Sequence, residues 1–413
     1  MPSLSDRILP ILGDIKHWGR NAKITVFTET FWSMPISWIL FYQTIFMREL
    51  GIGEAFIGYC VSVSLILQAF LPVLGGYLAD RFGRKRTIMF FDAAGWIGTT
   101  VTFFLAKEFW EIMLAMVFQG LPYAIEGVWD AYLGEDTNLE HRTGVFGFIR
   151  LIWIVAGLMT PVAGALVSLY GIEQGFRYIS LVGIATTSIM LLIRQILLRE
   201  SEIGKMLSSS GGSISSKPKS YIGTLRMVAK HKEVLILLIL SAIQGISAKM
   251  IATFRPLFLT DSRALALDES MVSVIPAASS TSSILGLLLV IPRLKSRHIR
   301  EALMLSYMCG FLGLVVLTTA PRESMFPAVV SVVFDSMRFL AVFSIMPVLM
   351  FNTVNEADPF AQAKIMSLMT AFSAMASWPV PAVGGYLYTI DPAFPFLVAS
   401  ASLIVGAGLL LKR

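Results

Sequence analysis

The sequence predicts an all-α polytopic membrane protein with twelve transmembrane helices in two six-helix repeats. Three observations carry this prediction: the composition, the lengths of the apolar runs and the distribution of the basic residues. Of the 413 residues, 55% are hydrophobic and 15% are charged, whereas roughly 25% of the residues of a soluble protein are charged. The mean hydropathy is +0.72 and the formal net charge is +6. A basic excess on so apolar a chain is typical of loops at a lipid surface, so we expect a lipid bilayer around it and no nucleic acid as a partner.

Twelve apolar runs are each long enough to cross a bilayer, which takes about 20 helical residues. The first six cover about residues 24–48, 54–79, 86–106, 109–133, 144–170 and 176–198. The second six cover about residues 233–260, 270–292, 299–320, 325–352, 362–389 and 392–411. We number these spans 1 to 12 in chain order.

A polar segment separates the two sets of spans and predicts two domains. Residues 199–232 contain the Gly/Ser-rich stretch SSSGGSISSKPKS, which is typical of a flexible linker. We therefore expect an N-terminal six-helix bundle over 24–198 and a C-terminal one over 233–413. The tail before them, 1–23, either forms a short interfacial helix with one apolar face or is merely solvated.

The 33 lysines and arginines give the orientation. With the N-terminus in the cytoplasm, 24 of them lie on the cytoplasmic side, including the eight in 194–232, and four lie within spans. The five on the opposite side are Arg48, Lys107, Arg177, Arg263 and Arg322. This asymmetry predicts a multi-pass protein of the inner (plasma) membrane with both termini in the cytoplasm.

The two halves also resemble each other in sequence. The segment from Gly76 that closes span 2 aligns with the segment from Gly286 that closes span 8, at an offset of 210 residues that also relates Lys85 to Lys295. Repeated six-span halves favour alternating access, in which two bundles rock about a site near the middle of the membrane. A passive channel does not need this architecture.

The segment GGYLADRFGRKR, residues 75–86, is the most specific motif in the chain. We expect Gly76 to allow close helix packing and Gly83 to allow a tight turn between spans 2 and 3. Asp80 can bond to Arg84, or to a helix N-terminus of the other half, as a latch that opens when the halves move. With Lys85, these residues are the predicted gating residues.

This segment resembles the G-x-L-a-D-R-x-G-R-K loop motif of the major facilitator superfamily, and twelve spans with a central linker extend the resemblance to the whole chain. The resemblance implies a secondary transporter whose spans 1, 4, 7 and 10 line a central cavity. Span 5 resembles, weakly, the Gly/Pro-rich motif of the family's drug:proton antiporters; a packing seam is the alternative interpretation of its small residues. Span 4 departs from that group, because the arginine of its R-x-x-Q-G motif is replaced here by Met116.

Ionisable side chains within spans are costly and are expected to be paired or functional. Nine such residues stand out: Glu29, Asp92, Glu126, Asp130, Arg150, Lys249, Arg255, Asp335 and Arg338. Seven of these nine lie on spans 1, 4, 7 and 10, the spans that the resemblance places around the cavity. Their positions therefore favour a transport site.

Two roles compete for these residues. We expect Glu126, Asp130 and Glu29 to couple transport to protons, because the repulsion between Glu126 and Asp130, one turn apart, favours a proton on one of them. The predicted substrate-binding residues are Gln119, Tyr123, Trp32, Lys249, Asp335 and Arg338. Gln119, Tyr123, Glu126 and Asp130 step by 4, 3 and 4, which predicts one common helix face. The alternative is structural pairing of Asp335 with Arg338, and of Asp130 or Asp92 with Arg150.

Motifs for other chemistry are absent from the sequence. It contains no G-x-x-x-x-G-K-[ST] phosphate loop, no H-E-x-x-H and no G-x-S-x-G, and its two cysteines, Cys60 and Cys309, lie in separate apolar runs. We therefore expect a monomeric protein that is not an enzyme and needs no metal or cofactor. Its expected partners are protons and a small-molecule substrate.

The sequence leaves three functions open. The first is proton-coupled export of amphipathic organic compounds. The second is proton-coupled uptake or exchange of a small anionic metabolite, which Lys249, Arg255 and Arg338 would suit. The third is a lipid flippase or another intramembrane lipid-handling protein.

Overall fold

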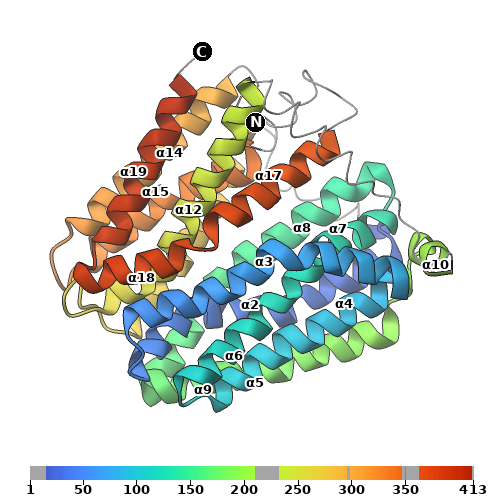
Figure 1. Ribbon diagram of the computed structural model, residues 1–413, viewed down its shortest axis with the longest axis horizontal. Coiled ribbons are helices and arrows are strands. Elements are labelled where there is room, and N and C mark those ends of the chain that lie inside the picture. Colours follow the sequence, from blue (N-terminus) through green and yellow to red (C-terminus); the bar gives the residue numbers. More distant parts are fainter. Residues whose placement is uncertain (1–14, 210–231, 295–297, 347–348, 350–361, 412–413) are drawn as a thin grey trace.

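The computed structural model describes residues 15–209, 232–294, 298–346, 349 and 362–411. Within them it is all-helical and contains the twelve predicted spans. Among the described residues, eight helical segments are long enough and apolar enough to cross a membrane, by length and composition only, and one of them, Glu140–Leu197, covers two spans. The helices form an N-terminal half, residues 20–197, and a C-terminal half, residues 232–411 (Figure 1).

Spans 1 to 6 form the N-terminal half. Their elements are α2 (Arg20–Glu49), α3 (Glu54–Phe82), α4 (Arg84–Asp92), the π-helical turn η2 (Ala93–Ile97), α5 (Gly98–Leu105), α6 (Phe109–Gly120), the 3₁₀ turn η3 (Leu121–Ile125), α7 (Glu126–Glu135), α8 (Leu139–Leu158) and α9 (Thr160–Leu197). Helix α9 completes span 5, bends at Gly171, where φ is +75°, and then forms span 6. A short turn, η1 (Ile15–His17), precedes α2.

Spans 7 to 12 form the C-terminal half. Their elements are α12 (Lys232–Thr260), η4 (Met271–Ser273), α13 (Val274–Leu289), η5 (Ile291–Arg293), α14 (Ile299–Thr318), α15 (Met325–Ser344), α17 (Gln362–Ser377), α18 (Val380–Ile390) and α19 (Phe394–Leu411). The first residues of the predicted linker form a helix, α10 (Glu202–Ser209). Most of its Gly/Ser-rich stretch, and the predicted interfacial face of the tail before residue 15, lie outside the described residues.

The helices of both halves run between two opposite ends of the molecule. We call the end with residues 50–53, 106–108 and 261–270 the loop end. The opposite end, where α2, α4 and α12 begin and α19 finishes, we call the terminus end. In Figure 1 the two halves meet at their loop ends and diverge toward their terminus ends.

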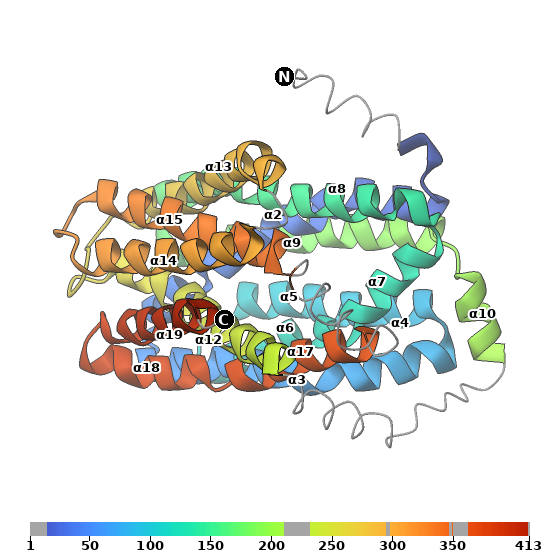
Figure 2. The same cartoon turned by 90° about the horizontal axis from the view of Figure 1, so that it is seen from above.

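The most extensive contacts between the halves are those of α3 with α18 and of α8 with α13, which lie on opposite flanks in Figure 2, and α2 also contacts α12. Glycines allow close approach near the loop end: a Cβ atom on Gly385 would come within 2.5 Å of the carbonyl oxygen of Glu54. The backbone N–H of Ala382 donates to the hydroxyl of Ser62 at 3.0 Å. The interface is therefore closed at the loop end.

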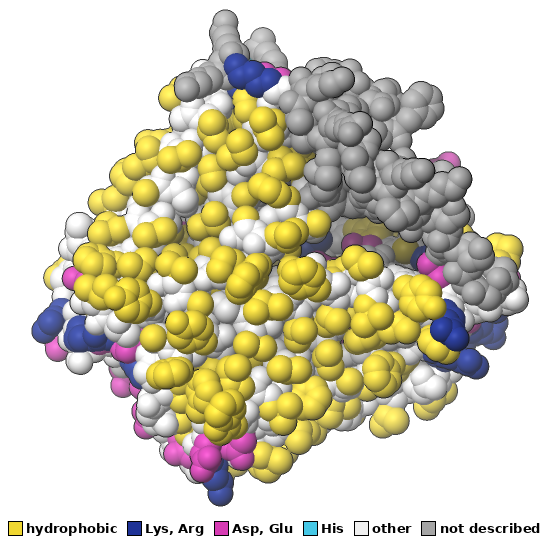
Figure 3. All heavy atoms as spheres, viewed as in Figure 1, with side chains coloured by type: hydrophobic (Ala, Val, Ile, Leu, Met, Phe, Trp, Pro, Cys, Tyr) yellow, Lys and Arg dark blue, Asp and Glu magenta, His cyan; other side chains and the backbone are white. Residues whose placement is uncertain are grey.

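The small residues of span 5 also lie at this interface. A Cβ atom on Gly157 would overlap the hydroxyl of Ser280, and one on Gly164 would overlap the hydroxyl of Ser273, both in the C-terminal half. The small side chains of span 5 therefore form a packing seam between the halves. Figure 3 shows the apolar outer surface of the protein and a hollow between the halves in which charged side chains are visible.

Candidate functional site

The charged residues of span 4 lie where the two halves face each other. Helix α7 begins at Glu126, and both Glu126 and Asp130 are exposed. Glu126 interacts electrostatically with Lys249, which is partly buried on α12 of the opposite half. Asp130 interacts in the same way with Arg150 of α8 and with Glu126. These four residues, which we call the interface cluster, therefore face the space between the halves.

The predicted common face of span 4 is wrong for Gln119. This side chain is 6% exposed and donates its amide to the side-chain oxygen of Gln43 at 3.1 Å, inside the N-terminal half. Tyr123 does lie close enough to Glu126 for an electrostatic interaction. Gln119 does not share the face of Glu126 because the 3₁₀ turn η3, which contains Pro122, lies between them and rotates the helix.

Glu29 lies in a separate, buried cluster. Its carboxylate accepts a bond from the guanidinium of Arg194 at 2.7 Å and from the indole of Trp153 at 2.8 Å. Asp92 lies 3.9 Å from the same guanidinium. Glu29 is 3% exposed, Asp92 6% and Arg194 3%. We call these three residues the buried triad.

Arg194 is not among the predicted site residues, because its place near the end of an apolar run groups it with the bases of the following loop. The structure corrects this: Arg194 is buried within α9. Its position four residues before the end of the apolar run 176–198 was the available signal. Of the two acids predicted as alternative partners of Arg150, Asp130 interacts with it, whereas Asp92 lies beside Arg194.

In the C-terminal half, Asp335 binds two arginines. It accepts bonds from Arg338 at 2.7 Å and from Arg255 at 2.8 Å. Arg338 also donates to the amide oxygen of Gln244 at 2.8 Å. The predicted pair of Asp335 and Arg338 is confirmed, and Arg255 is a partner that the spacing did not indicate.

Trp32 belongs to an aromatic group beside the buried triad. Its ring packs edge-on against Trp96 at 5.0 Å and Trp153 at 6.2 Å between ring centres. Arg150 lies over the Trp153 ring at 4.8 Å. The buried indole N–H of Trp32 has no hydrogen-bond partner among the described residues, so it is available to an acceptor on a bound molecule.

The predicted gating segment forms the turn between α3 and α4 at the terminus end. Gly83 has φ +97°, which confirms the tight turn expected there. The backbone N–H groups of Arg84 and Lys85 donate to the carboxylate of Glu200 at 3.0 Å, which caps α4. Arg84 also pairs with Glu135 at 2.7 Å.

The contacts that the motif makes here lie within the N-terminal half and the segment that follows it. The side chain of Lys85 donates to the carbonyl oxygen of Gln195 at 2.8 Å. Asp80 interacts electrostatically with Arg84, whose guanidinium forms its ion pair with Glu135. The role of these residues as a gate stays a prediction.

The prediction of close packing at Gly76 is wrong, because a Cβ atom added there would meet nothing within 4 Å. Its neighbour Gly75 is the packed residue, against the carbonyl oxygen of Ala124. Gly75→Ala is therefore expected to destabilise the protein by about 1–3 kcal/mol. Gly76→Ala, the matched control, is expected to change stability by less than about 0.5 kcal/mol. Thermal unfolding of the purified variants measures both, and equal losses would contradict the assignment.

Ion pairs join the two halves at the loop end. Arg48 at the end of α2 lies 3.6 Å from the carboxylate of Asp261, which follows α12. Arg263 bonds to Asp261 at 2.9 Å and to Glu54, at the start of α3, at 2.6 Å. Tyr388 of α18 donates to Asp261 at 3.1 Å. We call these five residues the loop-end ion cluster.

This loop-end ion cluster stays charged at neutral pH. Burial opposes ionisation of Asp261, but bonds from Arg263 and the charges of Arg263 and Arg48 outweigh it and hold the pKa of Asp261 below its usual range. The stability that this carboxylate contributes is present above the ordinary aspartate pKa of about 3.9. It is lost only as the pH falls through the lower pKa of the folded state. A group that responds to a physiological pH gradient must therefore lie elsewhere.

Removing the acids of the loop-end ion cluster is expected to open that end more often. The half-exposed pair of Arg263 with Glu54 contributes about 0–1 kcal/mol, so its loss shifts the equilibrium by up to about fivefold. The carboxylate of Asp261 is buried and pairs with two arginines, so its removal shifts the equilibrium further. The measurement is the rate at which a thiol reagent labels a cysteine at the contact residue Ser62, in a variant whose native cysteines are replaced by serine. Glu54→Gln with Asp261→Asn should raise this rate. The exposed loop-end change Glu323→Gln should not, and equal rates would contradict the prediction.

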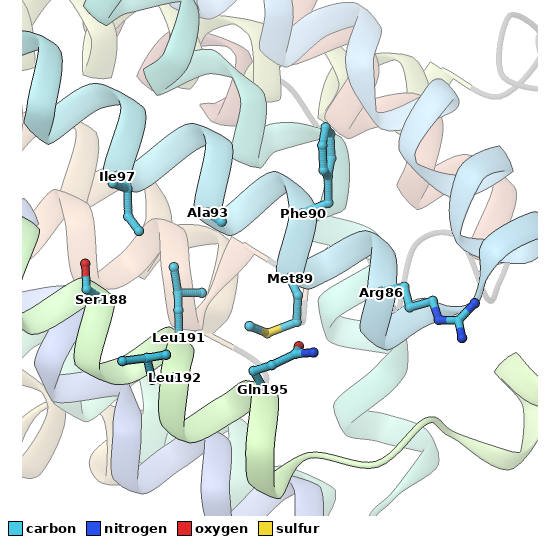
Figure 4. Close-up of a pocket in the computed structure, with 9 residues that line it drawn as sticks. All are labelled: Arg86, Met89, Phe90, Ala93, Ile97, Ser188, Leu191, Leu192 and Gln195. Atoms are coloured by element: carbon cyan, nitrogen blue, oxygen red, sulfur yellow. The ribbon is translucent and has the colours of Figure 1, made fainter.

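A groove on the outer surface is separate from these clusters. It has a volume of about 540 Å³ and lies between α4–η2 and α9 (Figure 4). Arg86 and Gln195 line one end, and Met89, Phe90 and Leu192 are among its apolar lining residues. Phe90 and Leu192 are 65% and 63% exposed. The groove therefore faces the lipid rather than the space between the halves.

Comparisons with known proteins agree with this architecture. A sequence model described as Major Facilitator Superfamily matches residues 24–378. The chain is 23% identical over 377 residues to multidrug resistance protein 2 of Bacillus subtilis, covering 88% of each chain. It is 28% identical over 170 residues to the multi-drug resistance efflux pump PmrA of Streptococcus pneumoniae, covering 39% of this chain and 41% of that one. A mutant of the nucleoside transporter NupG has the same fold, with a TM-score of 0.74 at 17% identity, covering 94% of this chain and 99% of that one.

Proposed function

The chain belongs to the major facilitator superfamily of transporters, and we propose that it exports amphipathic organic compounds in exchange for protons. The observation that carries this proposal is the interaction of Glu126 with Lys249 across the space between the halves. That space is closed at the loop end by packing and ion pairs. In this conformation the carboxylate of Glu126 is therefore reached from the terminus end and not from the loop end.

The exchange follows from the charge of Glu126. As an anion it attracts Lys249 or a cationic group of a substrate, and as a neutral acid it attracts neither strongly. A proton and a cationic substrate therefore compete for the same carboxylate. Competition of this kind drives the substrate out while protons enter, provided that the space between the halves opens alternately at the terminus end and at the loop end.

Two aromatic side chains of the N-terminal half support an amphipathic substrate. Tyr123 lies near the Glu126 carboxylate, and Trp32, beside the buried triad, has an apolar ring and an indole N–H without a hydrogen-bond partner among the described residues. Two relatives, one similar over 88% of this chain and one over 39% of it, are named for multidrug resistance. A small anionic metabolite is supported less, because Arg255 and Arg338 both bind Asp335 and leave Lys249 as the remaining base of the three.

We further propose that the protein works as a monomer in the inner (plasma) membrane with its terminus end in the cytoplasm. The excess of basic residues on that side supports this orientation. The conformation described above is then open toward the cytoplasm. In it, a substrate would reach Glu126 from inside the cell.

The test uses the purified protein in proteoliposomes, with the internal pH followed as compounds are added. Proton movement with lipophilic cations supports the proposal. Movement with organic anions alone would favour the uptake or exchange of an anionic metabolite. No response of transport to an imposed pH gradient would remove proton coupling.

A further inference from the structure

The buried triad has an unbalanced charge. It contains two carboxyl groups, Glu29 on α2 and Asp92 on α4, and one guanidinium, Arg194 on α9. The charged groups that act on Asp92 among the described residues are Glu29 and Arg194, and the side chain of Trp96 bonds to it. With both acids ionised, the triad would carry one net negative charge in the interior of the N-terminal half.

An uncompensated charge in such a place is strongly unfavourable. Arg194 cannot turn toward both acids equally, because its remaining contacts hold it in place: it donates to the hydroxyl of Thr28 at 2.9 Å and to the carbonyl oxygen of Thr25 at 3.2 Å. A bound proton removes the imbalance without moving any of these groups.

The geometry decides which acid takes that proton. Glu29 accepts two short bonds, from Arg194 at 2.7 Å and from Trp153 at 2.8 Å, and both favour its anion. Asp92 has a single donor among the described residues, the side chain of Trp96, and lies 3.9 Å from the guanidinium, which is too far for a hydrogen bond, so its anion is the less stabilised of the two. We propose that the buried triad is a proton-binding site, in which Asp92 is a neutral acid at neutral pH while Glu29 and Arg194 remain an ion pair.

Packed side chains connect this site with the interface cluster. Trp153 bonds to Glu29 on one side, and Arg150 lies over its ring on the other. Arg150 in turn interacts with Asp130 beside Glu126. A change in the charge of the buried triad therefore acts on groups that contact the space between the halves. A role in transport rests on the proposed proton coupling, whereas the bound proton itself does not.

Infrared spectroscopy of the purified full-length protein tests the proposal, because a protonated carboxyl group has its own absorption band. We expect such a band at neutral pH, and we expect labelling of the aspartate carboxyls with carbon-13 to shift it. Asp92→Asn should remove the band. Glu29→Gln should also remove it, because the triad then holds one carboxyl group and one guanidinium and is balanced without a bound proton. The control Asp130→Asn should keep it.

Three results would overturn the proposal: no band, a band that aspartate labelling does not shift, or a band that persists in Asp92→Asn. Size-exclusion profiles show whether each variant is folded, and Asp92→Asn leaves the ion pair of Glu29 and Arg194 intact. The band is measured without transport. If it depends on Asp92 while the proteoliposomes show no proton movement, the proposed function fails and the proton site stands. If proton movement depends on Glu126 and the band is absent, the proton site at Asp92 fails and the proposed function stands.

Discussion

Glu126→Gln is expected to abolish transport driven by a pH gradient while leaving the protein folded. Glutamine keeps the size and polarity of the side chain but can neither release a proton nor attract Lys249 as an anion. The loss should be about 150-fold or more, the upper end of a coupling free energy of about 1–3 kcal/mol. The measurement is substrate movement in proteoliposomes with and without an imposed pH gradient.

The matched control for this variant is Glu140→Gln. Glu140 is an exposed residue in the first turn of α8, so the same chemical change there should leave coupling intact. Transport without a gradient, driven by the substrate's own concentration difference, should survive in Glu140→Gln. It should weaken in Glu126→Gln, because the proposed mechanism has this carboxylate bind the cationic group of the substrate as well as the proton. Unchanged coupling in Glu126→Gln would remove this residue from the mechanism, and equal losses in both variants would indicate a general defect.

Arg194→Leu is expected to have the largest effect on stability. The change leaves Glu29 and Asp92 buried without their shared guanidinium, and breaking a buried ion pair by removing one partner costs about 3–5 kcal/mol. We expect loss of the monodisperse protein or a large fall in its thermal unfolding temperature. The exposed change Arg322→Leu should alter stability by less than about 0.5 kcal/mol.

A rescue experiment separates lost charge balance from lost packing. Adding Glu29→Gln and Asp92→Asn to Arg194→Leu removes the unpaired acids, so the triple variant should recover much of the stability. Replacing all members of a buried ion cluster is often close to neutral, whereas removing one is not. A triple variant as unstable as Arg194→Leu alone would show that the guanidinium acts through packing.

The order and approximate limits of the spans follow from local sequence. Apolar runs of spanning length become helices because a lipid environment leaves backbone groups no partner other than their own helix. The twelve runs and the turn at Gly83 were predictable for this reason. The breaks within spans were not: η3 rotates the face of span 4, and the merged helix α9 bends at Gly171.

Pairings between distant residues depend on the packing of helices. Asp335 and Arg338 are three residues apart on one helix, so their pair was predictable. Arg255 is 80 residues from Asp335, and Arg194 is 165 residues from Glu29. Spacing along the chain says nothing about such distances.

The sequence by itself determined that this is a twelve-span helical membrane protein with scarce charges concentrated on spans 1, 4, 7 and 10. It did so because hydrophobicity and the cost of a charge in lipid act residue by residue. Only the tertiary structure decided which charges share a buried space and which face the opposite half. Arg194 joined Glu29 to Asp92, and Lys249 came to face Glu126, because partner choice depends on distances that exist only after the helices have packed.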